Sequence, residues 1–241
     1  MRGIILSGGS GTRLSPLTKI TSKQLLPVYN RPMIFYPLNT LVKAGIKEIL
    51  IIVAPERAGD YLNLLGSGKQ FGCKFTYEIQ DKPKGIAEAF IIGENFIDQE
   101  DAVMILGDNI FEDDLSEQIK SFKRGGKIFA KQVPDPQRFG IVEFDDNMKA
   151  ISIEEKPKRP KSDYCVTGLY IYDNRVIEIA KNLKPSPRQE FEITDVNKKF
   201  LELGELEVAM VNGKWIDAGT FDSLLEAQNL AKEKLADKLI I

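Results

Sequence analysis

The chain has 241 residues, of which 43% are hydrophobic, and its 33 basic and 35 acidic side chains give a formal net charge of −2. This size and apolar content suit one large domain with a sizeable core, whereas the slightly acidic balance argues against a nucleic-acid partner. No apolar stretch approaches the length of a membrane span, and Cys73 and Cys165 lack metal-ligand spacing. We therefore expect a cytoplasmic chain with reduced thiols and no membrane partner.

Apolar, β-prone runs alternate with helical stretches along the chain, a pattern typical of an α/β sheet protein. In chain order, strands are expected at Gly3–Leu6, Glu48–Val53, Lys74–Ile79, Ala102–Leu106, Lys127–Gln132, Gly140–Phe144, Ala150–Glu154, Val166–Tyr172 and Glu207–Val211. Helices are expected at Met33–Ala44, Gly85–Asn95, Leu115–Lys123, Arg175–Asn182, Ile193–Leu203 and from Phe221 to about Leu235. The Pro- and Lys-rich Lys156–Lys161 predicts a loop, so the sequence indicates one domain over 1–241.

The first strand leads into a glycine-rich turn, SGGSGTRL at 7–14, with Lys23 ten residues past Arg13. Glycines let backbone N–H groups converge on phosphate oxygens, and the two cations would neutralise them, so this turn favours an anion site. An ordinary strand-to-helix loop is the alternative. The spacing matches neither a Walker A loop nor a dinucleotide-binding fingerprint.

Two aspartates are candidate metal ligands in a chain that has no histidine. Asp108 follows a buried-looking strand, and Asp217 follows Trp215 and Ile216. Without imidazole, a metal must be held by oxygen, which favours Mg²⁺ or Mn²⁺, and the chemistry should need little proton transfer. The alternatives are a common turn at Asp108 and a helix cap at Asp217.

Further polar candidates follow other expected strands. Gln80 offers a donor and an acceptor for a pyrimidine edge, and Gly85 stands at an expected helix start. Glu155 could accept hydrogen bonds from sugar hydroxyls, and Lys156 could hold a phosphate. A surface glutamine and a solvated charged turn are the alternatives.

Six motifs occur together and in one order: LSGGSGTRL (6–14), SKQLLPV (22–28), LGDNIF (106–111), EEKP (154–157), VTGLY (166–170) and EITDVN (192–197). In this combination the chain resembles the glucose-1-phosphate thymidylyltransferases over nearly its whole length. These enzymes make dTDP-glucose for the dTDP-rhamnose pathway. The resemblance implies a single nucleotidyltransferase domain over 1–241, with a three-layer, Rossmann-like fold and a mixed, mainly parallel central sheet.

The resemblance also implies residue roles. Nucleotide binding would use Gly8, Gly9, Ser10, Gly11, Thr12, Arg13, Gln80, Gly85 and Asp108. Sugar-phosphate binding would use Asn109, Gly140, Glu155, Lys156, Val166 and Arg188. Catalysis would use Arg13, Lys23, Asp108 and Asp217, the two aspartates holding Mg²⁺, for which Mn²⁺ should substitute. The substrates would be dTTP and glucose 1-phosphate, and the products dTDP-glucose and pyrophosphate.

Several features differ from the usual family pattern, among them Ser7 for alanine, Phe139 for tyrosine and a shorter hairpin before Trp215. Gln189 stands where glycine is usual, Ala218 stands where threonine is usual, and the chain stops at Ile241, short of the family's C-terminal helical segment. The last difference leads us to expect a homodimer or a monomer. Two other functions stay open on the sequence: an enzyme for UTP or another sugar 1-phosphate, and a regulatory module that binds sugar nucleotides without turnover.

Overall fold

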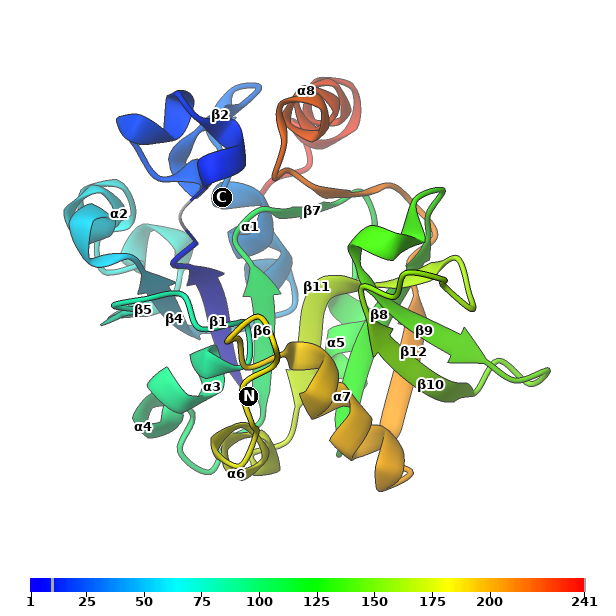
Figure 1. The fold of residues 1–241 in the computed structure, drawn as a ribbon. Coiled ribbons are helices and arrows are strands. Elements are labelled where there is room, and N and C mark those ends of the chain that lie inside the picture. Colours follow the sequence, from blue (N-terminus) through cyan, green and yellow to red (C-terminus); the bar gives the residue numbers. More distant parts are fainter. Residues whose placement is uncertain (10, 241) are drawn as a thin grey trace.

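The computed structural model describes residues 1–9 and 11–240, and its centre is a nine-stranded mixed sheet (Figure 1). Seven strands lie in the order β10-β9-β11-β6-β1-β4-β5, and β8 adds to β11 and carries β12. Their bounds are β1 Arg2–Ser7, β4 Glu48–Val53, β5 Lys74–Ile79, β6 Ala102–Leu106, β8 Gly126–Gln132, β9 Gly140–Phe144, β10 Ala150–Glu155, β11 Tyr164–Tyr172 and β12 Leu206–Met210. The strands β6, β1, β4 and β5 run parallel, and β11 is antiparallel to β6. The expected Rossmann-like, mixed sheet is confirmed.

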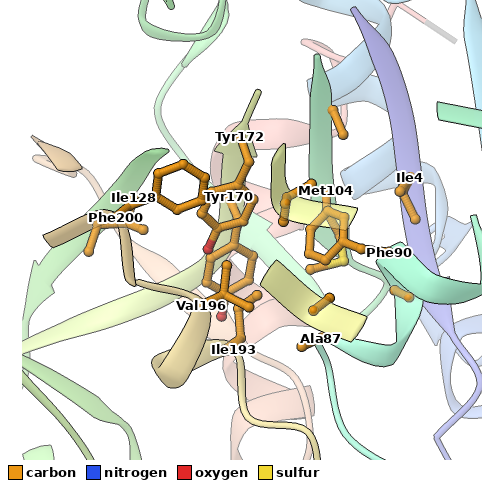
Figure 2. Close-up of a cluster of buried hydrophobic side chains, with 14 of the residues drawn as sticks. Ile4, Ala87, Phe90, Met104, Ile128, Tyr170, Tyr172, Ile193, Val196 and Phe200 are labelled. Atoms are coloured by element: carbon orange, nitrogen blue, oxygen red, sulfur yellow. The ribbon is translucent and has the colours of Figure 1, made fainter. Parts of the chain in front are cut away.

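Helices cover both faces of the sheet, which gives three layers. They are α1 Phe35–Lys43, α2 Ala58–Leu65, α3 Glu88–Ile92, α4 Glu94–Ile97, α5 Ser116–Lys120, α6 Arg175–Lys181, α7 Ile193–Glu202 and α8 Phe221–Leu230. One face packs against α3, α6 and α7, where Tyr172 stacks on Phe200 with ring centroids 5.2 Å apart (Figure 2). The other face packs against α1, α2 and α5. Central strands buried on both sides are therefore apolar almost throughout.

A third apolar cluster lies beyond the carboxyl ends of the parallel strands. It joins Leu14 of the glycine-rich turn to α8 and to two short ribbons, β2 (Pro27–Val28) with β3 (Arg31–Pro32) and β7 (Asn109–Phe111) with β13 (Trp215–Asp217). Figure 1 shows β7 following the end of β6 and passing below α8. This cluster gives the loops at the sheet edge a rigid support.

Most expected elements are present, with four differences. The expected helix Gly85–Asn95 begins only at Glu88 and breaks at Gly93 into α3 and α4. The helix α2 was not expected, and the short strands β2, β3, β7 and β13 were not expected either. The final helix ends at Leu230 and continues as one π-helical turn to Leu235. Both cysteines are free and buried, as expected. Within the described residues, no helix is long and apolar enough to cross a membrane.

Candidate active site

The polar candidates gather where parallel strands end at one edge of the sheet. In the ladder, Leu6 of β1 pairs with Leu106 of β6, and Ser7 pairs with Val53 of β4. The turn after β1 and the Asp108 segment after β6 therefore start side by side. Open α/β sheets bind ligands at this edge.

The β7–β13 ribbon brings the two aspartates and a third polar side chain together. Asp217 pairs with Asn109, and the backbone N–H of Ala218 donates to the carbonyl oxygen of Asp108 over 2.9 Å. Successive strand residues point to opposite sides, so Trp215 and Asp217 share one side of β13 while Ile216 enters the third apolar cluster. The ribbon thus buries its apolar side and presents its polar side to the cavity.

Asp108 and Lys23 form a buried ion pair, with their side chains only 12% and 10% exposed. Burial opposes both charges, but the contact keeps both groups ionised: Lys23 holds the pKa of Asp108 below its ordinary value, and Asp108 raises the pKa of Lys23. Asn109 Nδ2 also donates to Asp108 Oδ1 over 3.0 Å. The Asp108 carboxylate is therefore anionic at every physiological pH.

Asp217 differs from Asp108 in its ionisation. Burial and the neighbouring charge of Asp108 raise its pKa to about 7. Its Oδ1 is buried and has no hydrogen-bond partner within the described residues, and the guanidinium of Arg13 lies nearby at Gly219. The N-cap of α8 is Thr220, so a helix cap does not account for Asp217.

These observations fit a divalent cation between the two aspartates. An unpartnered buried oxygen and a carboxylate that resists ionisation both gain from a nearby positive charge. Within residues 1–9 and 11–240, no cluster of three or more His, Cys, Asp or Glu side chains converges. A metal held here would take its remaining ligands from substrate or water, as Mg²⁺ commonly does.

A cavity of about 240 Å³ opens beside this acidic pair. Seven of the expected site residues line it: Arg13, Asn109, Gly140, Glu155, Lys156, Val166 and Asp217. Its wall also includes Phe139 and Trp215, whose rings meet edge to face with centroids 5.3 Å apart. The cavity is therefore polar at the end near the aspartates and aromatic on one side.

Glu155 is the acceptor at the centre of a charged network on the cavity wall. It accepts hydrogen bonds from Thr194 Oγ1 over 2.5 Å and from the guanidinium of Arg188 over 3.2 Å, and Lys156 Nζ lies 3.3 Å away. Arg188 also contacts Glu192 at 2.8 Å. The sequence indicated these cations as phosphate ligands, and in this structure carboxylates neutralise them. Gln189 adopts a φ of 61°, the left-handed region that glycine tolerates best.

Gln80 lies next to the glycine-rich turn and Gly85 lies against the backbone of Phe191, and neither residue is part of the cavity wall. Gln80 is 3% exposed, so it is no surface glutamine, and its Nε2 donates to Glu88 over 2.8 Å. Its Oε1 faces Gly8 so closely that a Cβ at Gly8 would collide with it. Gly85 has a φ of 107°, and a Cβ there would collide with the backbone of Phe191. Gly85 precedes the helix rather than starting it.

The remaining turn residues are placed as follows. Gly11 has a φ of 62° and precedes the 3₁₀ turn Thr12–Leu14, while Gly9 has open space around its Cα. Thr12 and Arg13 are exposed. Ser10, expected in the nucleotide site, lies outside the described residues.

Sequence reasoning missed three side chains that shape the site: Trp215, Thr194 and Glu88. Each contacts an expected residue, Thr194 and Trp215 from distant segments and Glu88 from eight residues along the chain. Thr194 and Trp215 lie within or beside motifs that were singled out, which was the available signal. Nothing in the local pattern around Glu88 pointed to Gln80.

Comparison with known proteins identifies the class. The model of the nucleotidyl transferase family matches residues 2–234, so the chain belongs to this family of enzymes. Its relatives include the glucose-1-phosphate thymidylyltransferase of Neisseria meningitidis serogroup A, 52% identical over 96% of this chain and 83% of the relative. The enzyme of that name from Mycolicibacterium smegmatis is 51% identical over 96% of this chain and 82% of the relative. The resemblance that the motifs indicated is confirmed.

Solved structures agree. A Bacillus anthracis protein described as a glucose-1-phosphate thymidylyltransferase, crystallised with sucrose, superposes with a TM-score of 0.92 at 48% identity, over 97% of this chain and 96% of that one. A UDP-glucose pyrophosphorylase complexed with UDP-glucose superposes with a TM-score of 0.85 at 25% identity, over 97% and 98% of the two chains. Nucleotide and sugar-phosphate substrates follow from this family.

Proposed function

We propose that the chain transfers a thymidylyl group from dTTP to glucose 1-phosphate, giving dTDP-glucose and pyrophosphate. The observation that carries the proposal is the grouping of Lys23, Arg13, the buried Asp108 and the half-buried Asp217 at one end of the cavity. The names of relatives at about 50% identity supply the substrates. The proposal treats 1–241 as one nucleotidyltransferase domain.

The reaction is a phosphoryl-type transfer that needs no general base. A phosphate oxygen of glucose 1-phosphate attacks the α-phosphorus of dTTP in line, and the bond from that phosphorus to the bridging oxygen of pyrophosphate breaks. Because the attacking phosphate is already anionic, a chain without histidine can run this step. What remains is to hold two polyanions together and to stabilise charge on the leaving group.

Arg13 and Lys23 supply the positive charge in this proposal. Arg13 is exposed on the glycine-rich turn and reaches the cavity, so its guanidinium can pair with phosphate oxygens in two-point fashion. Lys23 is buried against Asp108, which keeps it protonated and fixed in place. Asp108 and Asp217 would hold Mg²⁺, which supplies charge neutralisation and orientation to the phosphates when bound.

The cavity would hold the glucose 1-phosphate. Glu155 would accept hydrogen bonds from the sugar hydroxyls. Its neighbours Lys156 and Arg188 would leave their carboxylate partners and bind the sugar phosphate instead. Gln80, which lies against Gly8 and donates to Glu88, would recognise the thymine edge. A Cβ at Gly85 would collide with the backbone of Phe191, so this position requires glycine, whereas a Cβ at Gly8 would displace the Gln80 side chain.

A second candidate is a uridylyl transfer, which the fold of the UDP-glucose pyrophosphorylase favours. Thymine and uracil share the edge that Gln80 would read, so this side chain does not separate them. A module that binds without turnover is a third candidate, from a different class. The ion pair of Lys23 with Asp108 argues for catalysis, because binding alone does not require it.

A pyrophosphate-release assay over a matrix of nucleoside triphosphates and sugar 1-phosphates tests all three. We expect the highest kcat/KM for dTTP with glucose 1-phosphate, and loss of turnover in EDTA. A higher kcat/KM for UTP would replace the proposal with the second candidate. Tight binding of dTDP-glucose without pyrophosphate release would establish the third.

A further inference from the structure

The single tryptophan of the chain, Trp215, contacts the side chain of Asn109 at the cavity wall. Its indole Nε1–H donates to Asn109 Oδ1 over 2.7 Å, and the backbone N–H of Gly168 donates to the same oxygen over 2.9 Å. An amide oxygen has two lone pairs, so both acceptor positions are used. The Asn109 oxygen is therefore committed to the protein.

The amide nitrogen of Asn109 faces the other way. One of its two N–H groups donates to Asp108 Oδ1 over 3.0 Å. If the amide were reversed, its oxygen would face the Asp108 carboxylate and its nitrogen would face two donors, so the reversed state is unfavourable on both sides. The second N–H belongs to a side chain that lines the cavity, where it can meet a ligand oxygen.

The approach of Gly168 to Asn109 leaves no room for another residue type. A Cβ at Gly168 would collide with the Asn109 amide. Trp215 is placed by the β7–β13 ribbon, in which it pairs with Phe111 while Asp217 pairs with Asn109. One short strand thus carries both an expected metal ligand and the group that orients Asn109.

We propose that Trp215 is a positioning residue whose indole N–H holds the Asn109 amide so that Asn109 meets the sugar 1-phosphate only as a hydrogen-bond donor. The inference rests on the proposed function for the identity of the ligand. It limits recognition at this point: the sugar oxygen facing Asn109 must accept a hydrogen bond. It also assigns Trp215 an effect on the sugar substrate that passes through Asn109.

Steady-state kinetics of Trp215→Phe form the first test. Phenylalanine keeps one aromatic ring beside Phe139 and removes the indole N–H together with the rest of the second ring. Gly168 still holds the amide, so we expect KM for glucose 1-phosphate to rise by roughly five- to tenfold, the worth of one hydrogen bond, with KM for dTTP within about twofold. Adding Trp215→Phe to Asn109→Ala should change KM for the sugar by less than about twofold, because the group that Trp215 orients is gone.

A second test does not depend on turnover. With one tryptophan, the ¹⁵N-labelled protein gives one indole N–H resonance. In Asn109→Ala the indole loses its acceptor, so the resonance should move upfield and its proton should exchange with solvent faster. Lys120→Ala, at an exposed position on α5, is the control and should leave the resonance in place.

The outcomes separate the two proposals. An indole resonance that does not change in Asn109→Ala would refute the positioning of Asn109 by Trp215. The same conclusion would follow if the effects of Trp215→Phe and Asn109→Ala on KM for glucose 1-phosphate were independent and multiplied in the double variant. Equal rises in both KM values would show a general structural role and overturn it as well. If glucose 1-phosphate proves not to be a substrate, the proposed function fails, while the indole resonance still decides whether Trp215 holds Asn109.

Discussion

Replacing Asp217 by asparagine should stabilise the metal-free protein while abolishing turnover. The carboxylate is buried beside Asp108, and these two causes raise its pKa from 3.8 to about 7. One pKa unit corresponds to about 1.4 kcal/mol, so the ionised carboxylate costs the folded state on the order of 4 kcal/mol. Asparagine has nearly the same shape and carries no charge.

The gain in folding stability of Asp217→Asn over the wild type should increase with pH. In the unfolded chain Asp217 loses its proton near pH 4, whereas in the folded chain it keeps the proton until about pH 7. The stability of the wild type therefore falls between these values as pH rises, and it is level above them. The difference between Asp217→Asn and wild type should be small near pH 4 and largest at pH 8, where roughly 2–4 °C per kcal/mol gives a Tm gap on the order of 10 °C.

Thermal unfolding in EDTA between pH 5 and pH 8 measures this gap. Asp222→Asn, an exposed carboxylate at the start of α8, is the matched control and should show no such pH-dependent gap. Adding Mg²⁺ should raise the Tm of the wild type and not that of Asp217→Asn. A gap of equal size at pH 5 and pH 8, or none at pH 8, would refute the reasoning about the aspartate pair.

Three further outcomes are expected. Lys23→Ala should lower kcat at least about a hundredfold and cost roughly 3–5 kcal/mol in urea unfolding, because it leaves the Asp108 charge buried and unpaired. Gly85→Ala should lower Tm and raise KM for dTTP, because the new Cβ would collide with the backbone of Phe191. The control is Gly45→Ala, which has a similar positive φ but open space and should lower the free energy of unfolding by only about 1 kcal/mol. Equal effects of the two substitutions would contradict the steric argument. Phe200→Ala, which removes a fully buried ring, should cost about 3–5 kcal/mol by denaturant unfolding without changing kcat of the folded fraction.

The elements that could be predicted from the sequence are those with a clear pattern of apolar residues. The central strands are buried on both faces, so β6 is an uninterrupted apolar run and β4 is apolar after Glu48, and the bounds of both strands agree with expectation. The helix α2 was missed because Pro55 stands three residues before its first residue and Gly59 lies in its first turn, and both residue types interrupt a helical pattern. Tertiary packing of Tyr61 and Leu65 outweighs that local preference.

The site was predictable to the extent that each residue sat in a recognisable motif. Asp108, Asn109, Glu155 and Asp217 were indicated by their places after strands and by resemblance, and they do converge. Their partners were not visible, because a hydrogen bond such as that from Trp215 to Asn109 joins residues 106 positions apart. A single sequence carries no record of which distant side chains meet.

The short β7–β13 ribbon explains why the acidic pair and the sugar wall form one unit. Its apolar residues, Ile110 and Ile216, are buried in the third cluster with α8, and the period of two along each strand then fixes the opposite side chains on the cavity. Asn109 and Asp217 face each other across that ribbon. The apolar packing of the ribbon thus holds Asp217 beside Asp108, although the charge of Asp108 opposes ionisation of Asp217. In the proposed function these two carboxylates hold Mg²⁺.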